Sequence, residues 1–333
     1  MRNIFYKPNR IRLFRINSFI QLVIAIPVLI FIVYKILYFS HWDDFFDWLN
    51  ENSKLFIGLI ILQLVLSAFN IFTETCKWRV LTSILYKQSF LENLRQVLWG
   101  IQAGMITPAK TGEPVGKALL LKKGNRRHGL ILSIAGSFFQ NIVIVTVGLI
   151  ALFVLKKFHV FTNDFFSILS DKIFYFAVLL PVVVILLLFI LYIFFLKPKK
   201  NEFFKRLGFY LKILKTLKLK ICIRVLFFTS MRYIIFSFQL WITLFFFDII
   251  SAPVYIWLIP IYYLVITFIP TIALVDLGVR SSAALIIFGI VSNNTAGIIM
   301  SVFIIWLFNQ VIPALTGIFI REKFFTNTNN YSN

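Results

Sequence analysis

Residues Leu55–Phe72 read LFIGLIILQLVLSAFNIF and decide the fold class, because they form a long apolar run without one charged side chain. A helix needs about 20 mostly apolar residues to cross the hydrocarbon of a bilayer. Similar runs recur along the 333 residues, of which 60% are hydrophobic and 14% charged. A soluble domain usually has about a quarter of its residues charged. We therefore expect an all-α, polytopic integral membrane protein.

The apolar runs predict about eight transmembrane helices in a single domain, residues 1–325, before a polar tail, 326–333, that we expect to be disordered. The amphipathic segment 91–106 is short for a span, and it either lies at the interface or enters and leaves the membrane on one side as a re-entrant element. The expected spans are 17–39, 55–72, 130–155, 173–196, 225–247, 252–269, a helix that ends near 291, and 296–320.

The net charge of +21 comes from 34 Lys and Arg against 13 Asp and Glu. The basic residues lie in loops between apolar runs, as at Lys77, Arg79 and Lys87, and ten of them lie in 197–224. This is the distribution expected for cytoplasmic loops, so we expect no nucleic-acid partner and place both termini in the cytoplasm. A basic cytoplasmic face also attracts anionic lipid headgroups.

Two polar segments interrupt the apolar sequence: ITPAKTGEPVGK at residues 106–117 and PTIALVDLGVR at residues 270–280. Hydrocarbon tolerates irregular backbone and charge only where protein or a water-filled cavity covers them. Paired Gly/Pro-interrupted segments in the two halves of a membrane protein indicate a site near the midplane between structural repeats. We therefore expect the functional site at these segments, and the sequence leaves an internal repeat open.

The polar segments carry the chemistry for binding an anion. Each offers backbone N–H groups at a helix N-terminus together with Lys110 and Lys117, or with Arg280, which suits a phosphate or carboxylate. Glu113 and Asp276 either pair with these bases or carry protons. Arg232, inside a predicted span, indicates function or a buried ion pair. The candidate substrate-binding residues are Pro108, Lys110, Gly112, Glu113, Lys117, Arg232, Asp276, Gly278 and Arg280.

The alternative interpretation is that Gly and Pro form cytoplasmic turns whose charges are solvated. We favour that interpretation for the basic residues Lys122, Lys123, Arg126 and Arg127. The amides inside predicted spans are more often contacts between helices than ligands; they are Gln140, Asn141, Gln239, Asn309 and Gln310.

The sequence predicts no metal site and no cofactor. It has two cysteines, Cys76 and Cys222, and three histidines, without the spacing of a metal site. No arrangement of nucleophile and base is recognisable either. We therefore expect that the chain is not an enzyme.

The first polar segment, Pro108 to Leu120, resembles the motif P-x-R-x-G-E-x-x-R-x-x-L-L of the lysylphosphatidylglycerol synthase transmembrane-region family. The second, Leu277-Gly278-Val279-Arg280, resembles that family's G-G-L-G-V-x-E motif, and the resemblance covers essentially the whole chain. Lys110 and Lys117 stand where Arg is usual, Asp276 where Gly is usual and Ser281 where Glu is usual. The acidic pair that often follows the first motif is replaced by Ser137 and Asn141.

The resemblance implies a flippase-like domain of the bacterial cytoplasmic (inner) membrane, without the soluble aminoacyl-transferase domain. Our first hypothesis is a flippase or transporter for an anionic phospholipid or a polyprenyl-linked lipid. The alternatives are a non-catalytic scaffold or subunit for a separate lipid-modifying enzyme, and, less favoured, a membrane enzyme that acts on a lipid headgroup. The expected partners are membrane lipids, with a homo-oligomer or a partner membrane enzyme left open.

Overall fold

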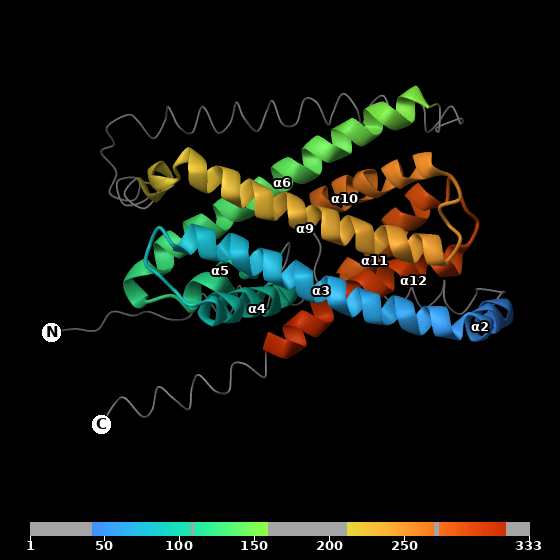
Figure 1. The fold of residues 1–333 in the computed structure, drawn as a ribbon, viewed down its shortest axis with the longest axis horizontal. Coiled ribbons are helices and arrows are strands. Elements are labelled where there is room, and N and C mark those ends of the chain that lie inside the picture. Colours follow the sequence, from blue (N-terminus) through green and yellow to red (C-terminus); the bar gives the residue numbers. More distant parts are fainter. Residues whose placement is uncertain (1–41, 108–109, 159–211, 270–272, 318–333) are drawn as a thin grey trace, which may run out of the picture.

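A computed structural model describes residues 42–107, 110–158, 212–269 and 273–317 of the chain (Figure 1). The expected spans 17–39 and 173–196, the polar tail and Pro108 lie outside these residues. Within the described ranges every regular element is a helix, which confirms the all-α class. Four helices there are long and apolar enough to cross a membrane, namely Ser53–Thr82, Lys123–Lys157, Leu219–Phe246 and Thr295–Gly317. The count of about eight spans stays a prediction.

The long helices pack side by side as a bundle (Figure 1). Helix α3 crosses α9, α6 contacts both α9 and α10, and α11 packs on α12. Their buried apolar side chains form one large core, with Leu240, Leu258 and Phe288 among its fully buried members. The elements outside the α4–α5 hairpin are α2 (Trp42–Glu51), α3 (Ser53–Thr82), α6 (Arg126–Lys157), α9 (Leu219–Phe246), α10 (Leu258–Phe268), α11 (Ala273–Phe288), α12 (Thr295–Trp306), and the 3₁₀ turns Lys123–Asn125, Lys212–Thr216 and Pro253–Trp257.

Helix α3 extends well beyond the expected span 55–72, because it continues to Thr82. Several polar residues in the second half of this helix are buried between the helices of the bundle. Glu74 and Lys77 are only 2% and 4% exposed, and they form an ion pair with each other. The expectation that Lys77 lies in a loop between spans is therefore wrong, because it lies inside α3 and its charge is compensated within the protein.

Helices α4 (Phe90–Ile106) and α5 (Gly112–Leu119) form a tight hairpin beside α3 and α6. A capping box fixes the start of α4, since the Ser89 hydroxyl accepts from the Glu92 N–H and the Glu92 carboxylate accepts from the Ser89 N–H. The two helices approach so closely that a Cβ at Gly116 would lie 2.8 Å from the Ala103 Cβ. Small residues thus let the polar segment run back along α4, which is the path a re-entrant element requires.

The second polar segment is more regular than its sequence suggests. Helix α11 begins at Ala273 and continues without a break to Phe288. Asp276, Gly278 and Arg280 therefore lie inside a helix. Because Asp276 and Arg280 are four residues apart, one helical turn brings their side chains together.

A π-helical turn, Leu307–Val311, follows α12 and is close to Pro313. Its Ile312 N–H donates to the Leu307 carbonyl five residues back. The next carbonyl, of Phe308, would need the N–H of residue 313, which is a proline and has none. The Ser67 hydroxyl of α3 donates to this carbonyl instead, at 2.6 Å. The wide turn is thus stabilised by a neighbouring helix.

Candidate functional site

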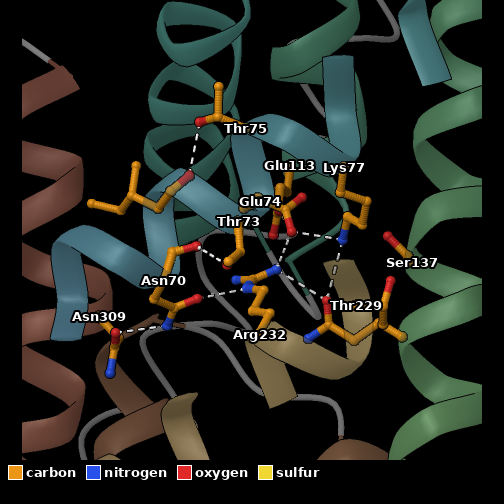
Figure 2. A network of polar contacts seen from close by, with 12 residues as sticks. Asn70, Thr73, Glu74, Thr75, Lys77, Glu113, Ser137, Thr229, Arg232 and Asn309 are labelled. Atoms are coloured by element: carbon orange, nitrogen blue, oxygen red, sulfur yellow. Dashed lines mark hydrogen bonds and ion pairs between the residues drawn. The ribbon is translucent and has the colours of Figure 1, made fainter. Parts of the chain in front are cut away.

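The most concentrated charge in the described part of the chain surrounds Glu74 of α3 (Figure 2). Its carboxylate contacts three cations from three helices. Lys117 Nζ of α5 lies 2.7 Å from Oε1. Lys77 Nζ lies 2.6 Å from Oε2, and the Arg232 guanidinium of α9 donates to the same oxygen. Lys117 also binds Glu113 at 2.7 Å. These five residues, Glu74, Lys77, Glu113, Lys117 and Arg232, are called the Glu74 cluster below.

Amide side chains connect the Glu74 cluster to the rest of the bundle. The Asn70 side chain accepts from Arg232 Nε at 2.8 Å and donates to Asn309 at 2.8 Å, and Asn309 donates to Gln239 at 2.9 Å. Gln140 of α6 accepts from Arg232 at 3.0 Å. Helices α3, α6 and α9 and the π turn are therefore joined by one polar network, which explains how so many polar groups persist among apolar helices.

The Glu74 cluster forms one wall of a cavity of about 650 Å³. The wall also contains Lys110, Arg280 and the aromatic side chains of Tyr262, Tyr263 and Trp306. Its uncharged polar residues are Asn70, Thr111, Ser133, Ser137, Gln140, Asn141, Thr267, Asn309 and Gln310. Both polar segments of the sequence, although far apart along the chain, thus reach the same cavity.

A second group of charges in the cavity lining surrounds Arg280 of α11. Its Nε lies 2.8 Å from the Asp276 carboxylate, and the Gln310 amide donates to the same carboxylate oxygen at 3.2 Å. Lys110 is the other cation in this part of the cavity lining. The Lys110 backbone is left-handed, with φ 55°. This conformation is costly for a residue with a Cβ, so the surrounding structure imposes it. We call Lys110, Asp276 and Arg280 the Arg280 group.

Of the candidate residues, Lys110, Glu113, Lys117, Arg232 and Arg280 all line the cavity. Asp276 lies behind Arg280 as its ion-pair partner. Two glycines have other roles. The Gly112 N–H donates to the Thr107 hydroxyl at 2.7 Å, so this donor is paired within the hairpin. Gly278 is a buried position inside α11.

Glu74 is the central residue that sequence reasoning missed. It lies past the apolar run, in a stretch taken for the end of a span. A usable signal was present, because Gln63, Ser67, Asn70, Glu74 and Lys77 follow one another at spacings of four and three residues. That spacing keeps all five on one face of a single helix. The polar face begun by Gln63 therefore predicts that Glu74 and Lys77 also point inward.

These observations define the class of protein: a multi-pass helical membrane protein with a charged cavity between its helices. The chain belongs to the family described as the lysylphosphatidylglycerol synthase TM region, whose model matches residues 18–317. It is therefore a lipid-related membrane protein, as the motif resemblance indicated. No curated protein and no solved structure matches the chain.

Proposed function

We propose that the protein is a flippase-like transporter that carries the headgroup of an anionic phospholipid or a polyprenyl-linked lipid through the membrane. One observation carries the proposal: five cations, Lys77, Lys110, Lys117, Arg232 and Arg280, line a single cavity between apolar helices. We place the protein in the bacterial cytoplasmic membrane with both termini inside. The proposal assigns it no chemical reaction.

The cavity addresses the main barrier to lipid movement, which is the cost of bringing a charged headgroup into hydrocarbon. Preformed cations and N–H donors replace the water that the headgroup loses. The volume of about 650 Å³ falls in the range typical of small-ligand sites. A headgroup therefore has both room and compensating charge between the helices.

The acyl chains also need a path, and the cavity rim supplies one. Ile134, Phe268 and Ile269 line the cavity and are 54%, 46% and 39% exposed. Such exposed apolar side chains suit contact with lipid tails. A lipid could therefore place its headgroup among the cations while its chains stay in the bilayer.

The test is lipid movement in proteoliposomes that contain the purified full chain. Anionic lipid with a fluorescent headgroup label is bleached from outside, and the fraction that becomes accessible is followed with time. We expect faster exposure than in protein-free vesicles, and a Lys110→Gln variant slower than the wild type by about tenfold or more, because a cation facing the anion is lost. Lys87→Gln, which removes an exposed charge away from the cavity, is the matched control. Movement equal to that in protein-free vesicles would exclude the proposal.

A further inference from the structure

The charges at the cavity do not cancel. Five cations line it, against the carboxylates of Glu74 and Glu113. Asp276, which pairs with Arg280 from behind, is a third carboxylate, so the described residues leave a surplus of two positive charges. The neighbouring positions 108–109 and 270–272, outside the described residues, carry no ionisable side chain in the sequence. Surplus charge in a low-dielectric site is costly unless a bound ion compensates it.

The surplus is shared, because three cations face two carboxylates in the Glu74 cluster and two cations face one carboxylate in the Arg280 group. It is most accessible at the Arg280 group. In the Glu74 cluster each cation already contacts at least one carboxylate at 2.7 Å or less. Lys110 differs, because no described residue forms a hydrogen bond or ion pair with its ammonium group, while Arg280, which has the same charge, lines the same cavity. Two cations that line one cavity favour an anion between them.

Unused hydrogen-bond donors point to the same conclusion. Trp306 lines the cavity, and its indole N–H is buried without an acceptor among the described residues. Arg280 Nε is close to Asp276 but is not aligned for a hydrogen bond to it or to any other described group. Trp306 also lies four residues before Gln310, which binds Asp276. Buried donors of this kind need an acceptor, and phosphate oxygens supply several.

We propose that the cavity binds a terminal phosphomonoester, a phosphate group with two negative charges, between Lys110 and Arg280. This rests on the proposed function and names the substrate class of the same site. A phosphomonoester matches the surplus of two charges, whereas the single charge of a phosphodiester leaves one cation uncompensated. Its three terminal oxygens also offer one more acceptor than the two of a diester. A lipid phosphate, of a diacylglycerol or of a polyprenol, carries this group, and so does a soluble phosphate ester.

The test compares phosphatidic acid with phosphatidylglycerol of identical acyl chains, a monoester and a diester. The purified full chain is mixed with equal amounts of both at pH 7, where the monoester is mostly dianionic, and retained lipid is measured by native mass spectrometry. We expect phosphatidic acid to be retained at least about tenfold more, since one extra charge beside a cation outside bulk water has that effect or a larger one. Equal retention would overturn the inference.

Variants locate the preference. Lys110→Gln should reduce the ratio of monoester to diester toward one, and it leaves no described carboxylate unpaired, so the protein should still fold. The paired variant Arg280→Gln, Asp276→Asn removes both members of one ion pair and should act in the same direction. Lys87→Gln lowers the net charge equally at an exposed position and should leave the ratio unchanged. A ratio that is unaffected by both cavity variants would place the preference elsewhere and overturn the inference.

A further arm separates the two sources of the phosphate. Glycerol 3-phosphate is added in excess to the protein loaded with phosphatidic acid. Retained lipid identifies a lipid phosphate as the ligand, and displacement identifies a soluble ester; both outcomes support the monoester site. The two proposals fail in different ways. If the protein prefers the monoester but moves no lipid, the transport proposal fails and this inference stands. If it moves lipids without that preference, the transport proposal stands and this inference fails.

Discussion

Helices α5 and α11 present the same element of sequence in different surroundings. Each carries an acid and a base four residues apart, Glu113 with Lys117 and Asp276 with Arg280, and in each the pair is closed, at 2.7 and 2.8 Å. Lys117 is bound a second time, by Glu74, and belongs to a network that joins several helices. Arg280 has one carboxylate and an additional cation, Lys110, beside it.

The difference indicates that two similar pairs serve different purposes. Around Glu74 every cation contacts a carboxylate, although three cations share two carboxylates, and such a network is expected of a group that holds helices together. Around Arg280 positive charge and donors exceed acceptors, which is expected of a group that awaits a ligand. We infer that the Glu74 cluster provides the frame of the cavity and that the Arg280 group receives the headgroup.

The largest loss of stability is expected from Glu74→Gln, which removes the central carboxylate of the Glu74 cluster. The change leaves Lys77 and Arg232 without a carboxylate in a buried position, and removing one partner of a buried ion pair typically costs about 3–5 kcal/mol. The melting midpoint of the purified protein should fall strongly. Glu51→Gln, at an exposed glutamate, is the control. If both variants melt alike, the Glu74 cluster does not hold the fold.

A double variant tests whether this loss arises from uncompensated charge. Lys77→Gln added to Glu74→Gln removes a cation whose ion-pair partner among the described residues is Glu74. The double variant should lose less stability than the two single losses added together, with a coupling of about 0.5–3 kcal/mol, as found for residues in contact. Simple additivity in the double-mutant cycle would argue against charge as the cause.

A smaller effect is expected from Gly116→Ala, which acts on the α4–α5 contact rather than on charge. The new Cβ would lie 2.8 Å from the Ala103 Cβ and 2.9 Å from the Trp99 carbonyl oxygen. Overpacking of this kind costs about 1–3 kcal/mol and should move α5 away from α4. The melting midpoint measures the loss, and Gly124→Ala, which meets nothing within 4 Å, should leave it unchanged.

The smallest change in stability is expected from Lys110→Gly. This variant separates binding from stability, and it therefore tests most directly the difference between the Arg280 group and the Glu74 cluster. Glycine adopts the left-handed backbone without strain, so stability should stay equal or rise by less than about 1 kcal/mol. Retention of an anionic lipid should nevertheless fall. A variant that melts normally and also keeps its lipid would show that Lys110 is not part of the binding site.

Much of the fold could be predicted from the sequence because hydrophobicity alone requires it. Long apolar runs predicted membrane helices, and the segment 91–106 is closely reproduced by α4. The length of α3 could not be predicted in this way. A hydropathy argument ends a span at charged residues, whereas Glu74 and Lys77 stay buried because cations and amides from other helices compensate them.

The candidate site was predicted in its parts but not in its organisation. Gly, Pro and charge in apolar surroundings correctly singled out segments that meet at one cavity. The sequence contains no information on which lysine faces which carboxylate, since Lys117 reaches Glu74 and Lys110 approaches Arg280 only through the packing of separate helices. Likewise, only the folded hairpin shows that Thr107 occupies the N–H of Gly112.

The π turn at Leu307–Val311 affects how related sequences should be aligned. Hydrogen bonds that span five residues instead of four accommodate one additional residue in the turn. A relative with a regular α-helix here, for example one without a proline at the position of Pro313, would need one residue fewer to reach the end of this turn. An alignment without a gap would then pair Asn309 with a position on another face, and the amide that joins three helices would be scored as variable.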